Sequence, residues 1–269
     1  MTRTTRLRRA AAALATALGL PALLVTVWWF ASDGSDNFYF PSLRTIQQVF
    51  PTTWLDGGSQ SRLVSDVLPS LARLAVGYGS AAVVGVAAGV LIGRQPWLRA
   101  LVEPVLEVFR AIPPPVIVPV LVALAGIDDL MKILVIALGC VWPIMLNTVE
   151  GVRAVDPVAE DTCRSYGVNG LSRVRALVLP SASPQIVTAL RQALSIAVIL
   201  MVISEMFAAS NGLGFTVVQF QRTFALPQMW TGIIVLGLVG VTLSVLFRLA
   251  EWRVLRWYEG LRRAHRGNP

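Results

Sequence analysis

The chain has 269 residues, of which 55% are hydrophobic and 14% are charged, and its formal net charge is +8. Soluble domains usually carry about 25% charged residues, so this composition excludes an ordinary water-exposed surface and predicts an integral membrane protein. One histidine and two cysteines argue against a His/Cys metal cluster and against a disulfide framework. Nucleic acid is not expected as a partner, because the arginines are spread between apolar runs rather than gathered on a polar domain.

Six apolar runs have about the 20 residues that a helix needs to cross the hydrocarbon core of a bilayer. They predict an all-α membrane protein with six transmembrane helices, at residues 10–30, 71–92, 101–125, 130–149, 186–207 and 230–249. The first run follows four arginines, as the apolar region of a signal peptide also does. Its length and its end at Trp28, Trp29 and Phe30 favour an uncleaved helix.

Glycine and proline mark two of these runs. The run at 71–92 contains glycines that would let a neighbouring helix approach closely, namely Gly77, Gly79, Gly85 and Gly89. The run at 101–125 contains the prolines 113–115, which predict a helix that is broken or kinked near its middle. These prolines and Pro143 are each either a simple kink or a stretch of non-helical backbone along a transport path.

The distribution of basic residues predicts the orientation of the chain. With the N-terminus inside, the inner segments hold 16 of the 23 basic residues and the outer segments hold three. This bias places both termini in the cytoplasm. The expected organisation is a basic segment with the first helix at 1–30, an extracytoplasmic loop at 31–70, a five-helix core at 71–257 and a basic cytoplasmic tail at 258–269.

Charges inside apolar runs need a partner, water or a function. Arg73 and Glu205 lie at similar depth near the outer ends of their runs, so we expect them to pair and to shape the outer mouth, unless each extends separately to the interface. The charges of the inner half are interpreted as members of structural ion pairs; they are Glu103, Glu107, Arg110, Glu150 and Arg191. Asp128, Asp129 and Lys132 are expected to form a solvated outer turn.

Polar residues within the runs are candidates for a substrate path, with hydrogen bonds between helices as the alternative. The candidate path consists of Asn147, Arg191, Gln192, Ser195 and Glu205. An anionic substrate would be consistent with Arg191 facing the pore. The glycine segment at 211–214 is expected to be a tight turn rather than a phosphate cradle, because no strand precedes it.

The inner connection at 151–184 has the pattern of two short helices joined at a corner. Asp156 and Pro157 suit the start of a helix that continues to Tyr166, and Gly167 suits a left-handed stop after it. A second short helix is expected at 171–179, ended by Pro180. Its apolar stripe, formed by Leu171, Val174, Leu177 and Val178, would suit the groove of a partner protein or, alternatively, the lipid interface.

These residues resemble the permease subunits of bacterial ATP-binding-cassette (ABC) importers, whose cytoplasmic signature reads E-A-A, three residues, G, nine residues, I-x-L-P. The matching positions have both spacings intact and are Asp161-Thr162-Cys163, Gly167, Leu177, Leu179 and Pro180. Thr162 and Cys163 replace the two alanines. The resemblance extends over about 40–257 and includes the segments 109–114, 138–148 and 204–214. Together these segments are similar to the branch that handles aliphatic sulfonates, taurine, nitrate and related small solutes.

The resemblance implies a type I importer fold, in which two permease subunits, expected to be identical, form the pore. It also implies that ATPase subunits dock on the corner and that an extracytoplasmic binding protein delivers the solute. The implied docking surface consists of Asp161, Thr162, Cys163, Gly167, Val168, Asn169, Gly170, Leu177, Leu179 and Pro180. The chain has no G-x-x-x-x-G-K-[ST] loop, so we expect it to bind no cofactor, while ATP and Mg are used by the partner ATPase.

The expected function is that of a non-enzymatic, multi-pass permease subunit of the bacterial inner membrane. It would import a small anionic solute of the sulfonate, taurine or nitrate type by alternating access. The alternatives are an ABC permease for a thiamine-precursor pyrimidine or another organic solute, and a secondary transporter without ATP. A membrane enzyme is disfavoured, because the single histidine, His265, lies in the basic tail and neither cysteine has a histidine nearby. A purely structural six-span subunit stays open.

Overall fold

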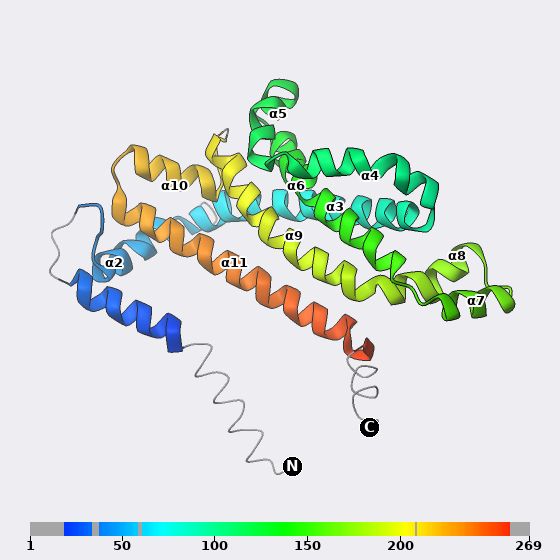
Figure 1. The fold of residues 1–269 in the computed structure, drawn as a ribbon. Helices are drawn as coiled ribbons and strands as arrows, with labels where there is room; N and C mark the ends of the chain where they lie inside the picture. Colours follow the sequence, from blue (N-terminus) through cyan, green and yellow to red (C-terminus); the bar gives the residue numbers. More distant parts are fainter. Residues whose placement is uncertain (1–18, 34–37, 59–60, 208, 259–269) are drawn as a thin grey trace, which may run out of the picture. The chain divides into compact units, whose positions relative to one another are not determined.

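The computed structural model describes residues 19–33, 38–58, 61–207 and 209–258. In this part of the chain every regular element is helical and no strand occurs (Figure 1). The long elements are an apolar helix at Gly19–Ser32, α2 (Leu43–Trp54), α3 (Leu68–Arg94), α4 (Pro96–Ala111), α5 (Ile117–Ala125), α6 (Asp129–Arg153), α7 (Pro157–Ser165), α9 (Leu179–Phe207), α10 (Leu213–Arg222) and α11 (Leu226–Val254). Short elements are the π-type turns η2 (Leu63–Val67) and η4 (Val174–Val178), the 3-10 turn η3 (Pro114–Val116) and α8 (Gly170–Arg173).

The chain divides into two compact units. The first contains Met1–Leu63 and Val217–Ile234, and the second contains Val64–Thr216 and Val235–Pro269. The inner connection and the candidate substrate path both belong to the second unit.

Helix α2 organises the first unit. Trp54 at its end is fully buried, and its Nε1–H donates a hydrogen bond of 2.7 Å to Thr231 Oγ1. At the other end the Ser42 hydroxyl accepts from the Thr45 backbone N–H, which is an ordinary N-cap. We expected only a loop at 31–70, so α2 is an element that the sequence analysis missed.

The core of the second unit consists of α3, α6 and α9, with α6 packed against both of the others. Glycines on α3 allow its close contact with α6. A Cβ atom at Gly77, Gly85 or Gly89 would lie 2.8, 2.9 and 2.5 Å from side-chain atoms of α6. The expectation of close packing is therefore confirmed at these three positions. It is wrong for Gly79, where a Cβ would meet nothing within 4 Å.

The third apolar run is broken, as the prolines predict. The helix axis bends by 76° between Pro96–Phe109 and Pro114–Ala125. Ile112 and Pro113 between them have extended backbone, with ψ angles of 119° and 123°. Pro143 behaves differently, because α6 continues through it without a break. Non-helical backbone therefore lies at 112–113 and not at Pro143.

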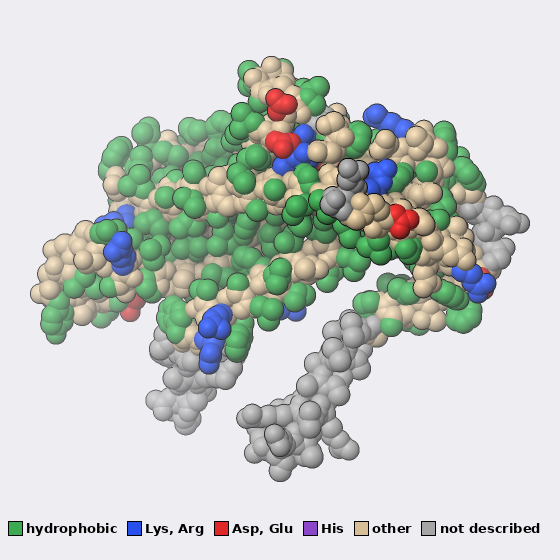
Figure 2. Space-filling model, turned by 180° about the vertical axis from the view of Figure 1, so that it is seen from behind, with side chains coloured by type: hydrophobic (Ala, Val, Ile, Leu, Met, Phe, Trp, Pro, Cys, Tyr) green, Lys and Arg blue, Asp and Glu red, His purple; other side chains and the backbone are tan. Residues whose placement is uncertain are grey.

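Among the described residues, four helices are long and apolar enough to cross a membrane, and the number rises to five when the bent pair of α4 with η3 and α5 is counted as one span. The four are Leu63–Arg94, Asp129–Arg153, Gly170–Phe207 and Leu226–Val254. Figure 2 shows hydrophobic side chains over most of the visible face, with charged side chains in a few places. Of the expected first span, residues 10–18 lie outside the described residues, as do the basic N-terminal segment and residues 259–269 of the tail.

The expected end of the second short helix at Pro180 is wrong. The chain stays helical from Gly170 through η4 into α9, and Pro180 lies in the first turn of α9. In the wider π-type turn, the Leu179 backbone N–H donates to the Val174 carbonyl five residues earlier. A wider turn next to the proline relieves the clash that its ring would make in a regular α-helix, so the helix continues.

Candidate functional site

Helix α7 begins as the sequence predicts. The Asp156 side chain accepts from the Val158 backbone N–H at 3.0 Å, and Pro157 occupies the first helical turn, where a missing N–H costs nothing. The Thr162 hydroxyl donates to the Val158 carbonyl one turn earlier. This capped helix fixes the first arm of the corner.

The corner itself depends on two glycines. Gly167 has a φ of +71° and Gly170 a φ of +59°, a backbone region that side chains with a Cβ rarely adopt. The Gly167 N–H donates to the Arg164 carbonyl at 3.1 Å, and the Val168 N–H donates to the Cys163 carbonyl at 2.9 Å. These two bonds form a Schellman motif, so the left-handed stop expected at Gly167 is confirmed.

The corner, formed by α7 and α8, lies where α6 ends and α9 begins (Figure 1). Asp161, Thr162, Asn169 and Gly170 are exposed, while Cys163 and Val168 are partly buried. Large apolar side chains are exposed beside them: Val158 is 71% exposed, Tyr166 82% and Leu171 63%. An ion pair between Glu160 and Arg173 ties the two arms together.

The apolar stripe of the second arm does not form a free surface. Val178 is buried and packs with Val152, Ala182 and Ile186, while Leu177 and Leu179 are partly buried. Only Leu171 of the stripe is largely exposed. The reason is the continuity with α9, because a helix that runs back into the core turns its apolar side toward the end of α6. Tyr166 and Val158, which the sequence analysis did not single out, supply exposed apolar surface instead.

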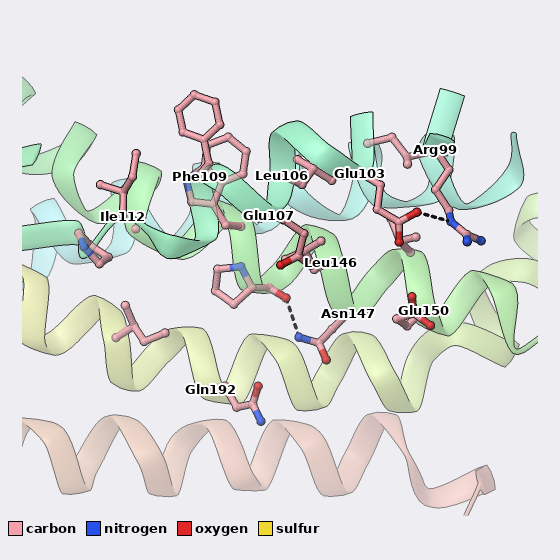
Figure 3. Close-up of a pocket in the computed structure, with 17 residues that line it drawn as sticks. Arg99, Glu103, Leu106, Glu107, Phe109, Ile112, Leu146, Asn147, Glu150 and Gln192 are labelled. Carbon is pink, nitrogen blue, oxygen red and sulfur yellow. Dashed lines mark hydrogen bonds and ion pairs between the residues drawn. The ribbon is translucent and has the colours of Figure 1, made fainter. Parts of the chain in front are cut away.

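A cavity of about 510 Å³ lies between α4, α6 and α9. Phe109 and Trp142 at its wall stack with ring centroids 4.8 Å apart and an interplanar angle of 11°. Figure 3 shows Glu103 and Glu107 reaching from α4 toward α6. Arg99 Nε donates to Glu103 Oε2 at 3.2 Å, so the Glu103 carboxylate has a charged partner.

Two of the five candidate path residues line this cavity. They are Asn147 of α6, whose Nδ2 donates to the Pro143 carbonyl at 2.8 Å, and Gln192 of α9 (Figure 3). Arg191, Ser195 and Glu205 do not line it. Arg191 instead contacts Glu251 of α11 at 3.3 Å, which is the kind of structural pair expected for it. Glu150, also expected to pair, contacts Arg153 at 2.8 Å.

The expected pair of Arg73 and Glu205 is confirmed at the other end of the second unit. Arg73 Nη1 lies 2.9 Å from Glu205 Oε1, and both side chains are buried. Arg73 also contacts Asp129 at 2.8 Å and donates to the side chain of Asn211 at 2.5 Å. The guanidinium thus joins α3, α6, α9 and the segment before α10.

The same carboxylate holds the start of α10. Glu205 Oε2 accepts from the Gly214 N–H at 3.0 Å, and the Ser70 hydroxyl accepts from the Leu213 N–H at 2.9 Å. Gly212 has a φ of +116°, so the segment at 211–214 forms the tight turn that was expected. Lys132 is a correction: it is buried, contacts Asp129 at 3.3 Å and donates to the Ile127 carbonyl, whereas we expected it in solvent.

Comparison with known proteins identifies the chain. Residues 81–256 match the family of binding-protein-dependent transport system inner membrane components. The chain belongs to this family. The permease is 28% identical over 244 residues to the taurine transport system permease protein of Escherichia coli K12, covering 90% of this chain and 89% of that protein. It is also 28% identical over 227 residues to the nitrate import permease protein of a Synechocystis strain, covering 83% and 82%.

A solved structure supports the fold. The permease superposes on a chain of the methionine ABC transporter MetNI in an inward-facing conformation with a TM-score of 0.63 and 22% identity, covering 75% of this chain and 98% of that one. The protein is therefore a multi-pass inner-membrane permease subunit of an ABC importer with the type I permease fold. In this family the ATPase is a separate chain, and permease subunits of the family work together with an ATPase and a substrate-binding protein.

Proposed function

We propose that this permease imports a small anionic solute of the sulfonate, taurine or nitrate type, and that a separate ATPase drives the transport by alternating access. The observation that carries the proposal is the likeness to the taurine and nitrate permeases over most of the chain. ATP and Mg are used by the partner ATPase, and this chain binds no cofactor. The described residues contain no group of His, Cys, Asp and Glu that could hold a metal ion.

The proposed ATPase-docking surface is the corner of α7 and α8. It comprises the exposed residues Asp161, Thr162, Asn169 and Gly170, the turn at Gly167 and Val168, and Cys163, Leu177, Leu179 and Pro180 behind them. Tyr166 and Leu171 extend it with exposed apolar surface. A corner held by a Schellman motif and an ion pair is rigid, which suits the transmission of ATPase movement into α6 and α9.

We further propose six spans, with the first at 10–30, and both termini in the cytoplasm. The basic bias of the inner segments supports this orientation. Two identical permease subunits would form the pore within the lipid bilayer, since two-fold assembly is the commonest closed symmetry. The organisation proposed above, with the extracytoplasmic loop at 31–70, the core at 71–257 and the coupling connection at 151–184, follows from the same topology.

The proposed substrate path runs along the cavity between α4, α6 and α9. Asn147 and Gln192 lie at its wall and offer amide groups that hydrogen-bond either an anion or a neutral solute. Three further residues belong to the proposed path, namely Arg191, Ser195 and Glu205. Because they do not line this cavity, we propose that they position the helices of the path and do not contact the solute.

The cavity wall favours a second candidate solute. Glu103 and Glu107 line it, and the stacked rings of Phe109 and Trp142 offer an apolar aromatic wall. Carboxylates beside aromatic rings suit an amino-substituted heterocycle, such as a thiamine-precursor pyrimidine, better than they suit nitrate. Taurine carries an ammonium group as well as a sulfonate, so it is compatible both with the likeness to the taurine permease and with the carboxylates of the cavity wall.

Uptake into proteoliposomes tests the proposal. The permease is reconstituted with its ATPase, the binding protein is added outside, and ATP is enclosed. We expect ATP-dependent uptake of radiolabelled taurine or nitrate. Uptake of an aminopyrimidine with no uptake of either anion would replace the first candidate by the second, and accumulation without ATP would contradict the ABC mechanism.

A further inference from the structure

A second, smaller cavity of about 150 Å³ lies at the root of the coupling connection, apart from the proposed path. Its wall is formed by the ends of α3 and α6, by α7, by the end of α8 and by η4. The charged residues of this wall are three arginines, Arg94, Arg153 and Arg173, and one carboxylate, Glu160. The lining side chains therefore carry two more positive than negative charges.

The hydrogen bonding of these arginines is incomplete. Arg173 pairs with Glu160, but its Nε–H is buried and has no acceptor within the described residues. The side chain of Arg94 is exposed and makes no hydrogen bond or ion pair with any described residue. A buried guanidinium N–H without an acceptor is costly, so this position favours a ligand that brings an acceptor oxygen.

Two of the arginines have an alternative explanation. Arg94 and Arg153 lie in the last turns of α3 and α6, where a positive charge complements the helix dipole. Arg153 also pairs with Glu150 at 2.8 Å. Neither fact accounts for the buried Nε of Arg173. The helix-end explanation therefore covers Arg94 and Arg153 and leaves the buried Nε of Arg173 unexplained.

We infer that this cavity binds an oxyanion, a sulfate, sulfonate or phosphate group, between Arg94, Arg153 and Arg173. Guanidinium groups bind such oxygens with short, charge-assisted hydrogen bonds and fixed geometry. The anion would connect the ends of α3 and α6 to α8, which forms one arm of the proposed ATPase-docking corner. The inference does not depend on which solute the permease transports.

The anion has two possible sources, a free ion of the cytoplasm and the phosphate of an anionic lipid, and the experiment separates them. The full chain is placed in nanodiscs of phosphatidylcholine and titrated with sodium sulfate, with sodium chloride holding the ionic strength constant. Binding is measured by isothermal titration calorimetry. In parallel, native mass spectrometry counts the phosphatidylglycerol molecules that stay bound to chain taken from nanodiscs containing that lipid.

The test variant is Arg94→Gln, because Arg94 has no partner among the described residues whose loss would disturb the fold. The matched control is Arg175→Gln, which removes the same charge from another exposed position, on the coupling connection and outside the cavity. Loss of one charge-assisted bond weakens binding by about tenfold. Unchanged thermal unfolding without sulfate shows that the test variant is folded.

Saturable sulfate binding that Arg94→Gln weakens about tenfold and Arg175→Gln leaves unchanged supports a site for a free oxyanion. Phosphatidylglycerol retention that depends on Arg94 alone, without sulfate binding, supports the same site with a lipid phosphate as its ligand. The inference is overturned if neither ligand binds. It is also overturned if both variants weaken binding equally, because equal weakening indicates attraction to the overall surface charge rather than a specific site.

Discussion

Arg73 and Glu205, which are separated by 132 positions in the sequence, form a buried ion pair of 2.9 Å at the ends of α3 and α9. The pair does not stand alone, because the same carboxylate accepts hydrogen bonds from Ser70 at 2.7 Å and from the backbone of Gly214 at 3.0 Å. Its position ties the turn before α10 to the core of the second unit. A buried Glu205 carboxylate with this many hydrogen-bond partners stabilises the packing of these segments.

Removing the arginine should therefore destabilise the protein strongly. Arg73→Met leaves Glu205 buried without its charged partner, and we expect a loss of about 3–5 kcal/mol in the free energy of unfolding. The control is Arg99→Gln, which breaks the partly exposed pair of Arg99 and Glu103 and should cost less than about 1 kcal/mol. Thermal unfolding in detergent compares the two. Equal shifts of the unfolding temperature for both variants would show that the buried pair contributes no more to stability than the partly exposed pair.

The tight turn at Gly212 gives a second prediction. A Cβ there would lie 2.5 Å from the Glu205 carboxylate, and the φ of +116° adds backbone strain. Gly126 has a φ of +75° but free space around a Cβ, so Gly126→Ala should show only the strain, about 1–3 kcal/mol. We expect Gly212→Ala to lower the unfolding temperature more than Gly126→Ala. The reverse order would contradict the contact with Glu205.

Helix packing gives a third prediction, again with a matched control. Gly89→Ala places a Cβ 2.5 Å from Thr148 and 2.7 Å from the Met145 carbonyl, and should cost about 1–3 kcal/mol because α3 and α6 must move apart. Gly79→Ala on the same helix meets nothing within 4 Å and should be neutral. The measurement is the folded fraction of each variant after a graded heat treatment, compared with that of the unchanged chain. A neutral Gly89→Ala would mean that α3 and α6 do not pack this closely.

The substrate cavity can be probed through Gln192. Gln192→Leu removes an amide from the wall while keeping a similar volume, and we expect the KM of uptake to rise several-fold with the expression level unchanged. Ser195→Ala, three residues further along α9 and outside the cavity, should leave the KM unchanged. If Ser195→Ala has the larger effect, the path follows a different face of α9.

Local patterns in the sequence predicted the features that depend on a few neighbouring residues. The stop at Gly167 and the break before Pro114 follow from the backbone preferences of glycine and proline. The pairing of Arg73 with Glu205 followed from topology, because two opposite charges at equal depth have few other partners in a bilayer.

Features that depend on packing were missed. Lys132 is buried because Asp129 and the Ile127 carbonyl are close enough to satisfy its charge. The sequence around Asp128, Asp129 and Lys132 does not reveal this burial. Pro180 does not end its helix because the turn before it widens. The lining of the first cavity arises only when α4, α6 and α9 come together, and that of the second only when the ends of α3 and α6 meet α7, α8 and η4.

The most direct test of the account is co-purification of the ATPase with variants of the corner. The tagged chain is purified from mild detergent and the bound proteins are identified by mass spectrometry. Val cannot readily adopt the φ of +71° found at Gly167, whereas Asn tolerates it, so Gly167→Val should lose the ATPase and Gly167→Asn should retain it. Retention of the ATPase by both variants, or purification of the unchanged chain without an ATPase, would contradict docking at this corner.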